Sequence, residues 1–232
     1  MLAAAAFVPV PPLLVPEIAG GSAAADEPMR AACGAAVRRL SAATLDELIV
    51  VGAGACTGEV TGSWDWRGFG VASPAEPPAD RLPHALAIGA WLLQRHGGPN
   101  DATRFQAISE DLPAADCADL GRALAGGERR VGLLVCGDGS ACRTEKAPGY
   151  FDPDAPAWDE AALAALRRGE PTGLLALDGE LGARLLAAGR APWQVLAGAA
   201  GDDAFDATVD WADAPYGVMY VVGTWMRKKG TR

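Results

Sequence analysis

Short apolar runs bounded by glycine or proline recur along this chain of 232 residues. Four of them have the length and the Val, Leu and Ile content typical of strands buried on both faces. They span Leu2–Val8, Glu47–Val51, Val131–Cys136 and Gly217–Trp225. Two further strands are expected at Phe105–Ser109 and Phe205–Trp211. The spacing of these runs constrains the fold more than any other feature of the sequence.

Between the runs lie segments rich in Ala, Leu and Arg whose apolar residues recur at helical spacing. They are Met29–Ser41, Arg81–His96, Ala114–Ala125, Trp158–Arg168 and Leu174–Ala188. Strands that alternate with helices predict an α/β fold, a three-layer α/β/α sandwich. With 50% hydrophobic residues the chain can bury a full core, and this length favours one domain. We place that domain at residues 1–226, followed by a basic tail at 227–232.

Two segments resist a regular interpretation. Residues 57–80 contain many glycines and prolines, which indicates a long loop with at most one edge hairpin, and residues 143–156 indicate a second loop. Both follow the ends of predicted strands. Open α/β sheets place their ligand sites at the carboxyl ends of strands, so these loops are expected to border a site.

Charge and composition exclude several classes of function. The formal net charge of −9 disfavours binding to nucleic acid or to an anionic membrane surface, since both need clustered Lys and Arg. No segment offers the ~20 uninterrupted apolar residues of a membrane span. The N-terminus lacks the early Lys or Arg of a secretion signal, and we expect it to form the first buried strand. Five cysteines without a C-x-x-C pair indicate reduced thiols and a cytoplasmic protein.

The motif GAGACTG at 52–58 superficially resembles a dinucleotide-binding turn. The third glycine of G-x-G-x-x-G would fall at position 57, where the chain has threonine, and no helix is expected to follow. We therefore interpret the motif as a tight turn. Cys136 and Cys142 flank GDGSA and are close enough in sequence to approach each other, although buried structural thiols are the commoner arrangement.

The chain has two histidines, His84 and His96, which limits the chemistry it can perform. Gly137-Asp-Gly-Ser140 lacks the pattern of a serine hydrolase elbow. An Fe(II) site of two histidines and one carboxylate would need both rings on one ion, yet they lie twelve residues apart on one helix. His96 precedes two glycines and is expected at a helix end. His84 is expected at a helix start after a loop, facing either solvent or a pocket.

Three segments together carry a family resemblance: FVPVPPLLVPE at 7–17, GDGSACRTEKAPGYFDP at 137–153 and AGRAPWQVLAGA at 188–199. In this order they resemble the actinobacterial branch of the class III extradiol dioxygenase family, the LigB-like fold. The resemblance covers Met1 to about Trp225. It implies a mixed central sheet between helices and, in active members, a non-haem Fe(II) site that opens catechol-type rings with O₂.

The family's functional residues do not carry over. Active members place an iron-ligating histidine between the prolines of P-x-P-P, where this chain has Val10. The second histidine ligand of such members has no counterpart in 52–57. The acid/base histidine that ends the family's G-D-x-S-H falls on Ala141. The resemblance therefore implies a pseudoenzyme that binds a small molecule or a partner, with no metal or cofactor.

Polar residues remain around the same predicted strand ends. The candidate pocket residues are Val10, Glu17, His84, Asp138, Ser140, Ala141, Glu145, Lys146, Tyr150 and Trp193. One alternative is an active extradiol dioxygenase-like oxidoreductase whose Fe²⁺ is held by substitutes such as Glu17, Asp138, His84 or Cys56. Another is a metal-free hydrolase or lyase that uses Lys146 or a pair of carboxylates.

Tryptophans outside the helices, at 64, 66, 211 and 225, also predict a homodimer.

Overall fold

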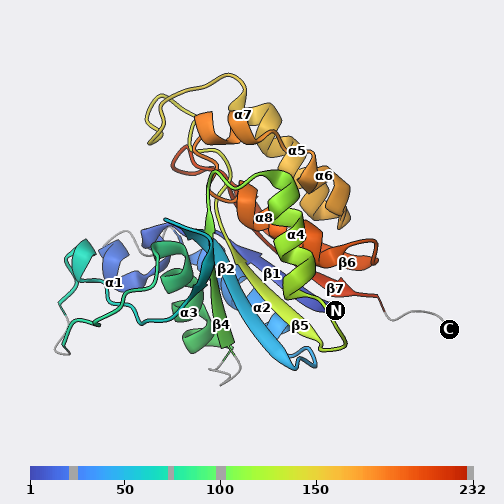
Figure 1. The fold of residues 1–232 in the computed structure, drawn as a ribbon. Coiled ribbons are helices and arrows are strands. Elements are labelled where there is room, and N and C mark those ends of the chain that lie inside the picture. The colour runs from blue at the N-terminus through green and yellow to red at the C-terminus, as the bar shows by residue number, and fades with distance from the viewer. Residues whose placement is uncertain (21–25, 73–75, 98–102, 229–232) are drawn as a thin grey trace.

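A seven-stranded mixed sheet forms the centre of the protein, in the order β3-β4-β2-β5-β1-β7-β6 (Figure 1). The computed structural model describes residues 1–20, 26–72, 76–97 and 103–228. The strands are β1 (Leu2–Val8), β2 (Glu47–Gly54), β3 (Gly58–Val60), β4 (Thr103–Ser109), β5 (Val131–Cys136), β6 (Phe205–Asp213) and β7 (Tyr220–Arg227). The predicted strands 2–8 and 131–136 are confirmed with the same bounds.

The middle of the sheet is parallel and its two edges are antiparallel. β4, β2, β5 and β1 run parallel, so their carboxyl ends share one edge. β7 pairs antiparallel with β1, and β6 with β7, at one side, while β3 pairs antiparallel with β4 at the other. The sequence-based expectation of a mixed sheet in an α/β sandwich is confirmed.

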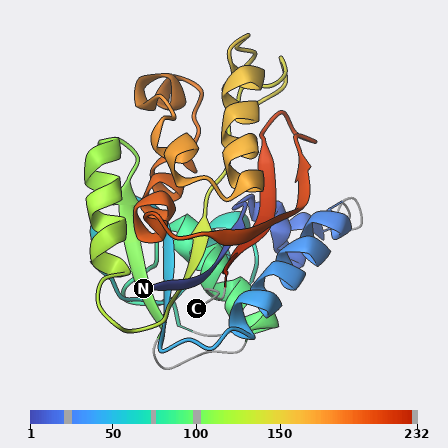
Figure 2. The ribbon, with the colours of Figure 1, turned by 90° about the vertical axis from the view of Figure 1, so that its right-hand side faces the viewer.

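Helices cover both faces of the sheet, which gives three layers (Figure 2). Residues of α2 (Glu27–Ser41) and α3 (His84–His96) pack on one face. Residues of α4 (Ala114–Leu124), α5 (Ala155–Arg168) and α8 (Arg190–Ala200) pack on the other. The shorter helical segments are η1 (Pro12–Leu14), α1 (Pro16–Ala19), η3 (Arg67–Phe69), α6 (Pro171–Leu175) and α7 (Gly179–Arg184). Among the described residues, no helix combines the length and apolarity needed to cross a membrane.

Several sequence-based boundaries differ from the structure, and three of them concern the segments 174–188, 52–58 and 227–232. The single helix expected at 174–188 is two short helices, because Asp178 accepts a hydrogen bond from Leu181 N and caps a new helix, α7. The turn expected at 52–58 begins later, since β2 continues to Gly54 in register with β4. The proposed tail begins inside the sheet: Arg227 ends β7 and Lys228 N bonds to Ala204 O. Residues 229–232 of that tail lie outside the described residues.

Glycines at 52 and 54 allow the end of β2 to pass close to its neighbours. A Cβ atom on Gly52 would lie 2.9 Å from Ala85 Cβ, and one on Gly54 would lie 2.8 Å from Ala107 Cβ. The strand therefore passes closer to its neighbours than a side chain would permit. This close approach brings the end of β2 beside the start of α3, which is where the cleft described below begins.

The tryptophans that suggested self-association are largely packed within the protein. Trp225 is fully buried and its Nε1 donates to Leu166 O at 2.8 Å. Trp64, Trp66 and Trp211 are partly buried and pack against the core on the α2–α3 face. The homodimer stays a prediction.

Candidate functional site

The proline turn after β1 joins the ends of β1 and β5. Gly137 N donates to Val8 O at 3.0 Å, and Val10 N donates to the Asp138 carboxylate at 2.8 Å. Prolines at 9, 11 and 12 fix the backbone on either side of Val10. Two of the three segments that carry the family resemblance thus meet at one edge of the sheet.

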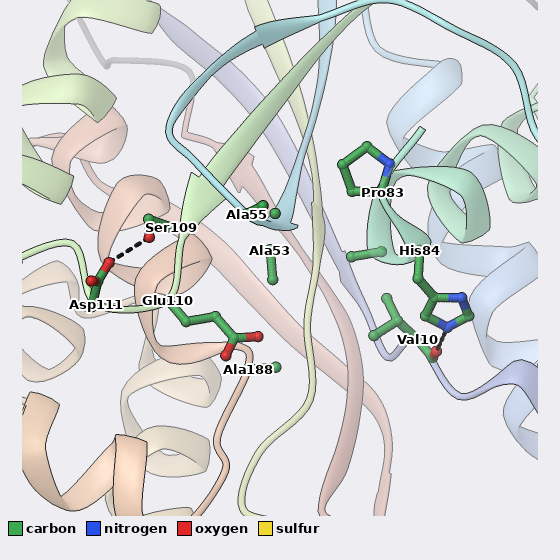
Figure 3. A pocket seen from close by; sticks show the side chains of 11 residues that line it. Val10, Ala53, Ala55, Pro83, His84, Ser109, Glu110, Asp111 and Ala188 are labelled. Carbon is green, nitrogen blue, oxygen red and sulfur yellow. Dashed lines mark hydrogen bonds between the residues drawn. The ribbon is translucent and has the colours of Figure 1, made fainter. Parts of the chain in front are cut away.

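A cavity of about 570 Å³ opens at this edge, beside the carboxyl ends of β1, β2 and β4 (Figure 3). Its apolar wall includes Val10, Ala53, Ala55, Pro83 and Ala188. His84 lies on the same side as Val10, whereas Ser109, Glu110 and Asp111 lie across the cavity from them. We call this space the cleft. It stands where open α/β sheets hold their ligands.

His84 is fixed by the proline turn. As the first residue of α3 it places its Nε2 2.8 Å from the carbonyl oxygen of Val10. A carbonyl oxygen only accepts hydrogen bonds, so Nε2 carries a proton, and in the neutral ring Nδ1 is left as an acceptor. Phe69 contacts the ring with a centroid distance of 5.5 Å. Both backbone polar groups of Val10 are therefore occupied, and only its isopropyl group faces the cleft.

The acidic side of the cleft is positioned from behind by Arg190. This buried residue begins α8, and its guanidinium donates to Leu112 O at 2.6 Å, to Glu110 O and to Gln194 Oε1. It therefore fixes the backbone of the loop after β4. Ser109 Oγ donates to the Asp111 carboxylate, and the Glu110 carboxylate is directed toward the middle of the cleft (Figure 3).

Asp138 lies beneath the proline turn with an altered protonation equilibrium. Burial raises the pKa of this carboxyl to about 7, and the hydrogen bond from Val10 N opposes that shift. Burial raises the pKa values of Cys33, Cys136 and Tyr220 around it, and the charge of Asp138 adds to each shift. The turn that forms the wall of the cleft therefore rests on a carboxyl that titrates near neutral pH.

A pH dependence of stability follows from Asp138. Its pKa is higher in the folded than in the unfolded chain, so folding favours the protonated form, and stability falls as pH rises through about 4 to 7. One pKa unit corresponds to about 1.4 kcal/mol, and the partial exposure of Asp138 reduces the full effect. Between pH 5 and 8.5 we expect the free energy of unfolding to fall by roughly 2 kcal/mol more in the wild type than in Asp138→Asn.

Urea denaturation of both proteins at the two pH values measures this difference. The amide that Asp138→Asn introduces retains an oxygen that accepts from Val10 N but does not titrate, which makes the variant a matched control. Equal pH profiles for the two proteins would show that Asp138 keeps an ordinary pKa.

The structure separates the other candidate pocket residues from the cleft. Ser140 is fully buried and bonds to Asp159, at 2.8 Å from its N and 2.6 Å from its Oγ. Ala141 packs in the core, with its N bonded to Leu185 O. The Asp138–Ala141 segment thus shares the edge with Val10 but does not line the cleft, because these bonds turn it toward α5 and α7.

The remaining candidates lie farther apart. Glu145 and Lys146 line a separate cavity with Tyr216, and Tyr150 is 62% exposed. Glu17 is exposed on α1. Trp193 is buried, with its ring 6.2 Å from that of Trp158. These residues do not form one pocket, since the loop at 143–156 extends over the surface instead of folding back over the cleft.

Sequence reasoning missed the acidic side of the cleft. Ser109, Glu110 and Asp111 follow the predicted strand 105–109 directly, so their place at a carboxyl end was available as a signal. Arg190 carried no such signal, because its role depends on α8 packing behind β4.

Cys136 and Cys142 do not pair: all five cysteines are free, and Cys142 Sγ bonds to Leu185 O. In the described ranges, no group of three or more His, Cys, Asp or Glu side chains is placed to hold a metal ion.

No protein-family model and no curated protein matches the chain. Among solved structures, it is similar to the crystal structure of uncharacterized protein JW3007 from Escherichia coli K12. The TM-score is 0.55 at 16% sequence identity, over 97% of this chain and 99% of the other. This likeness extends to the fold, over nearly the whole of both chains.

Proposed function

We propose that this chain is a LigB-like protein whose cleft binds a small organic molecule without the iron chemistry of active family members. The observation that carries the proposal is Val10. It stands at the position where the resemblance places an iron-ligating histidine, and its side chain lines the cleft. An isopropyl group has no lone pair to give to a metal, while it supplies apolar contact surface to a ligand.

The polar groups of the cleft indicate what such a ligand carries. Glu110 and Asp111 present carboxylates, which only accept hydrogen bonds when ionised. The opposite wall is apolar at Val10 and Pro83 (Figure 3). A small, largely apolar molecule with hydroxyl donors at one end fits this division, and it resembles the catechol-type substrates that the family resemblance implies.

The proposal is tested with 4-methylcatechol and its dimethyl ether, 3,4-dimethoxytoluene. The two molecules share a ring, but the ether has no hydroxyl donors. In EDTA-treated buffer we expect 4-methylcatechol to raise the midpoint of thermal unfolding and the ether to leave it unchanged, because ligand binding to the folded state stabilises it. Glu110→Gln removes an ionised acceptor and is expected to weaken binding by about tenfold.

Variants distinguish the cleft from other surfaces. Ala188→Leu fills the cleft from its wall and is expected to abolish the stabilisation, whereas Ala123→Leu, on the exposed side of α4, leaves it intact. Equal stabilisation by both molecules, or by 4-methylcatechol in Ala188→Leu, would overturn the proposal.

The alternative, an active dioxygenase with substitute ligands, is tested on the same samples. Fe(II) is added anaerobically, and O₂ uptake with 4-methylcatechol is followed after aeration. We expect no protein-dependent uptake. Ring cleavage would instead support the alternative.

The free thiols agree with our proposal of a cytoplasmic location, where reducing conditions keep cysteines unpaired.

A further inference from the structure

A second concave site lies between α2 and α3, on the sheet face away from α8. It is a groove of about 290 Å³, to which α2 contributes Glu27, Arg30 and Arg38 and α3 contributes Trp91, Arg95 and His96. We call it the α2–α3 groove. A chain with a formal charge of −9 here concentrates three arginines and one of its two histidines.

Two of these arginines have no carboxylate partner among the described residues. Arg30 is paired with Glu27 and also donates to Leu13 O. Arg38 instead contacts His96 Nδ1 at 3.4 Å, and the Arg95 guanidinium lies 5.6 Å from the centre of the Trp91 ring. Elsewhere in the described chain most arginines are paired with carboxylates, for example Arg104 with Glu47 and Glu59. The groove therefore holds positive charge that the protein leaves unneutralised.

His96 adds a donor to the same groove. Arginine only donates, so His96 Nδ1 accepts from Arg38 and the proton of the neutral ring is on Nε2. Burial, followed by the charges of Arg38 and Arg95, lowers the pKa of His96. Gly34 makes room for this arrangement, because a Cβ there would lie 3.0 Å from His96 Cε1 and 3.1 Å from Arg38 Nη1.

We propose that the α2–α3 groove binds a phosphate group, held by Arg38, Arg95 and His96. A phosphate dianion offers acceptors to both guanidinium groups and to an imidazole at once, and arginine is suited to such oxyanions by its planar set of donors. The Glu27 carboxylate is held by Arg30, which reduces its repulsion of an anion. The site is independent of the cleft, since the two share no lining residue.

The test is a proton NMR titration of the two histidine rings with inorganic phosphate, against sodium chloride at equal ionic strength. His84→Gln assigns the His96 signal. We expect phosphate to bind with a Kd on the order of 1 mM and to raise the pKa of His96, because a bound anion favours the imidazolium. The groups that face His96 are Arg38 and Arg95, with the Glu27–Arg30 pair at the same groove.

Variants separate a built site from general attraction to cations. Arg38→Gln and Arg95→Gln are each expected to weaken phosphate binding at least about fivefold. Arg122→Gln removes an exposed arginine from α4 and is expected to change nothing. An unchanged His96 signal in phosphate, or an equal response in the Arg38→Gln and Arg122→Gln proteins, would overturn the proposal. Failure here leaves the proposal for the cleft untouched, because that test contains no phosphate.

Discussion

Replacing Gly198 by alanine is expected to lower the free energy of unfolding by about 3 kcal/mol, the cost of overfilling a close helix contact. A Cβ on Gly198 would lie 2.2 Å from Ala118 O, and one on Gly121 would lie 2.1 Å from Val195 O. These are contacts with backbone atoms, so α4 and α8 would have to separate. Alanine also gains up to about 1 kcal/mol of helix propensity over glycine, which is too little to compensate.

Gly68→Ala is the matched control, because a Cβ at that position meets nothing within 4 Å. Urea denaturation of the two variants and the wild type measures the difference. A Gly198→Ala protein as stable as Gly68→Ala would show that α4 and α8 do not cross as closely as described. Arg190 begins α8 and supports Glu110. We therefore also expect the Gly198→Ala protein to bind 4-methylcatechol more weakly than the wild type.

Asp159→Ala is expected to cost about 3 to 5 kcal/mol of stability, the range for breaking a buried charged network. Asp159 is 1% exposed and accepts from Ser140 N, Ser140 Oγ and Arg143 Nη1. Removing its carboxylate leaves two Ser140 donors buried without a partner. The bonds from Ser140 to Asp159 hold the segment that follows β5. Loss of the Asp159 carboxylate therefore also loosens Asp138, which bonds to Val10.

Glu160→Ala is the control for Asp159→Ala, since Glu160 is the adjacent carboxylate on α5 and is exposed. We expect it to change stability by less than about 0.5 kcal/mol. Chemical denaturation at pH 7 distinguishes the two variants. Similar losses in both would mean that the Asp159 network contributes no more than a surface charge.

The sequence predicts the bounds of a strand well when the whole strand is buried. Leu2–Val8 and Val131–Cys136 are buried along nearly their whole length, so continuous apolar runs identify them. The segment 174–188 misled because its apolar spacing suits one helix, whereas the cap at Asp178 divides it. A capping residue acts on only the few residues that follow it. The apolar spacing alone therefore does not reveal whether a helix continues through such a residue or ends before it.

The sequence predicts which edge of the sheet carries the candidate site, but only some of the residues that line it. The prolines around Val10 and the strand before Asp138 placed these two residues together, and a 2.8 Å hydrogen bond joins them. Ser140 was included because it is polar and follows a strand, yet its partner Asp159 comes from a helix that sequence does not position. The place of Glu110 in the cleft likewise depends on long-range contacts, through Arg190.

The most direct measurement of metal-independent binding in the cleft is an amide NMR titration with 4-methylcatechol in the presence of EDTA. We expect saturable shifts confined to Val10, Ala53, His84, Glu110 and Ala188, with the signals of the α2–α3 groove unmoved. The same shifts should appear whether or not Fe(II) has been removed. Shifts that appear only after Fe(II) is restored, or that map outside the cleft, would contradict a metal-independent ligand site at Val10.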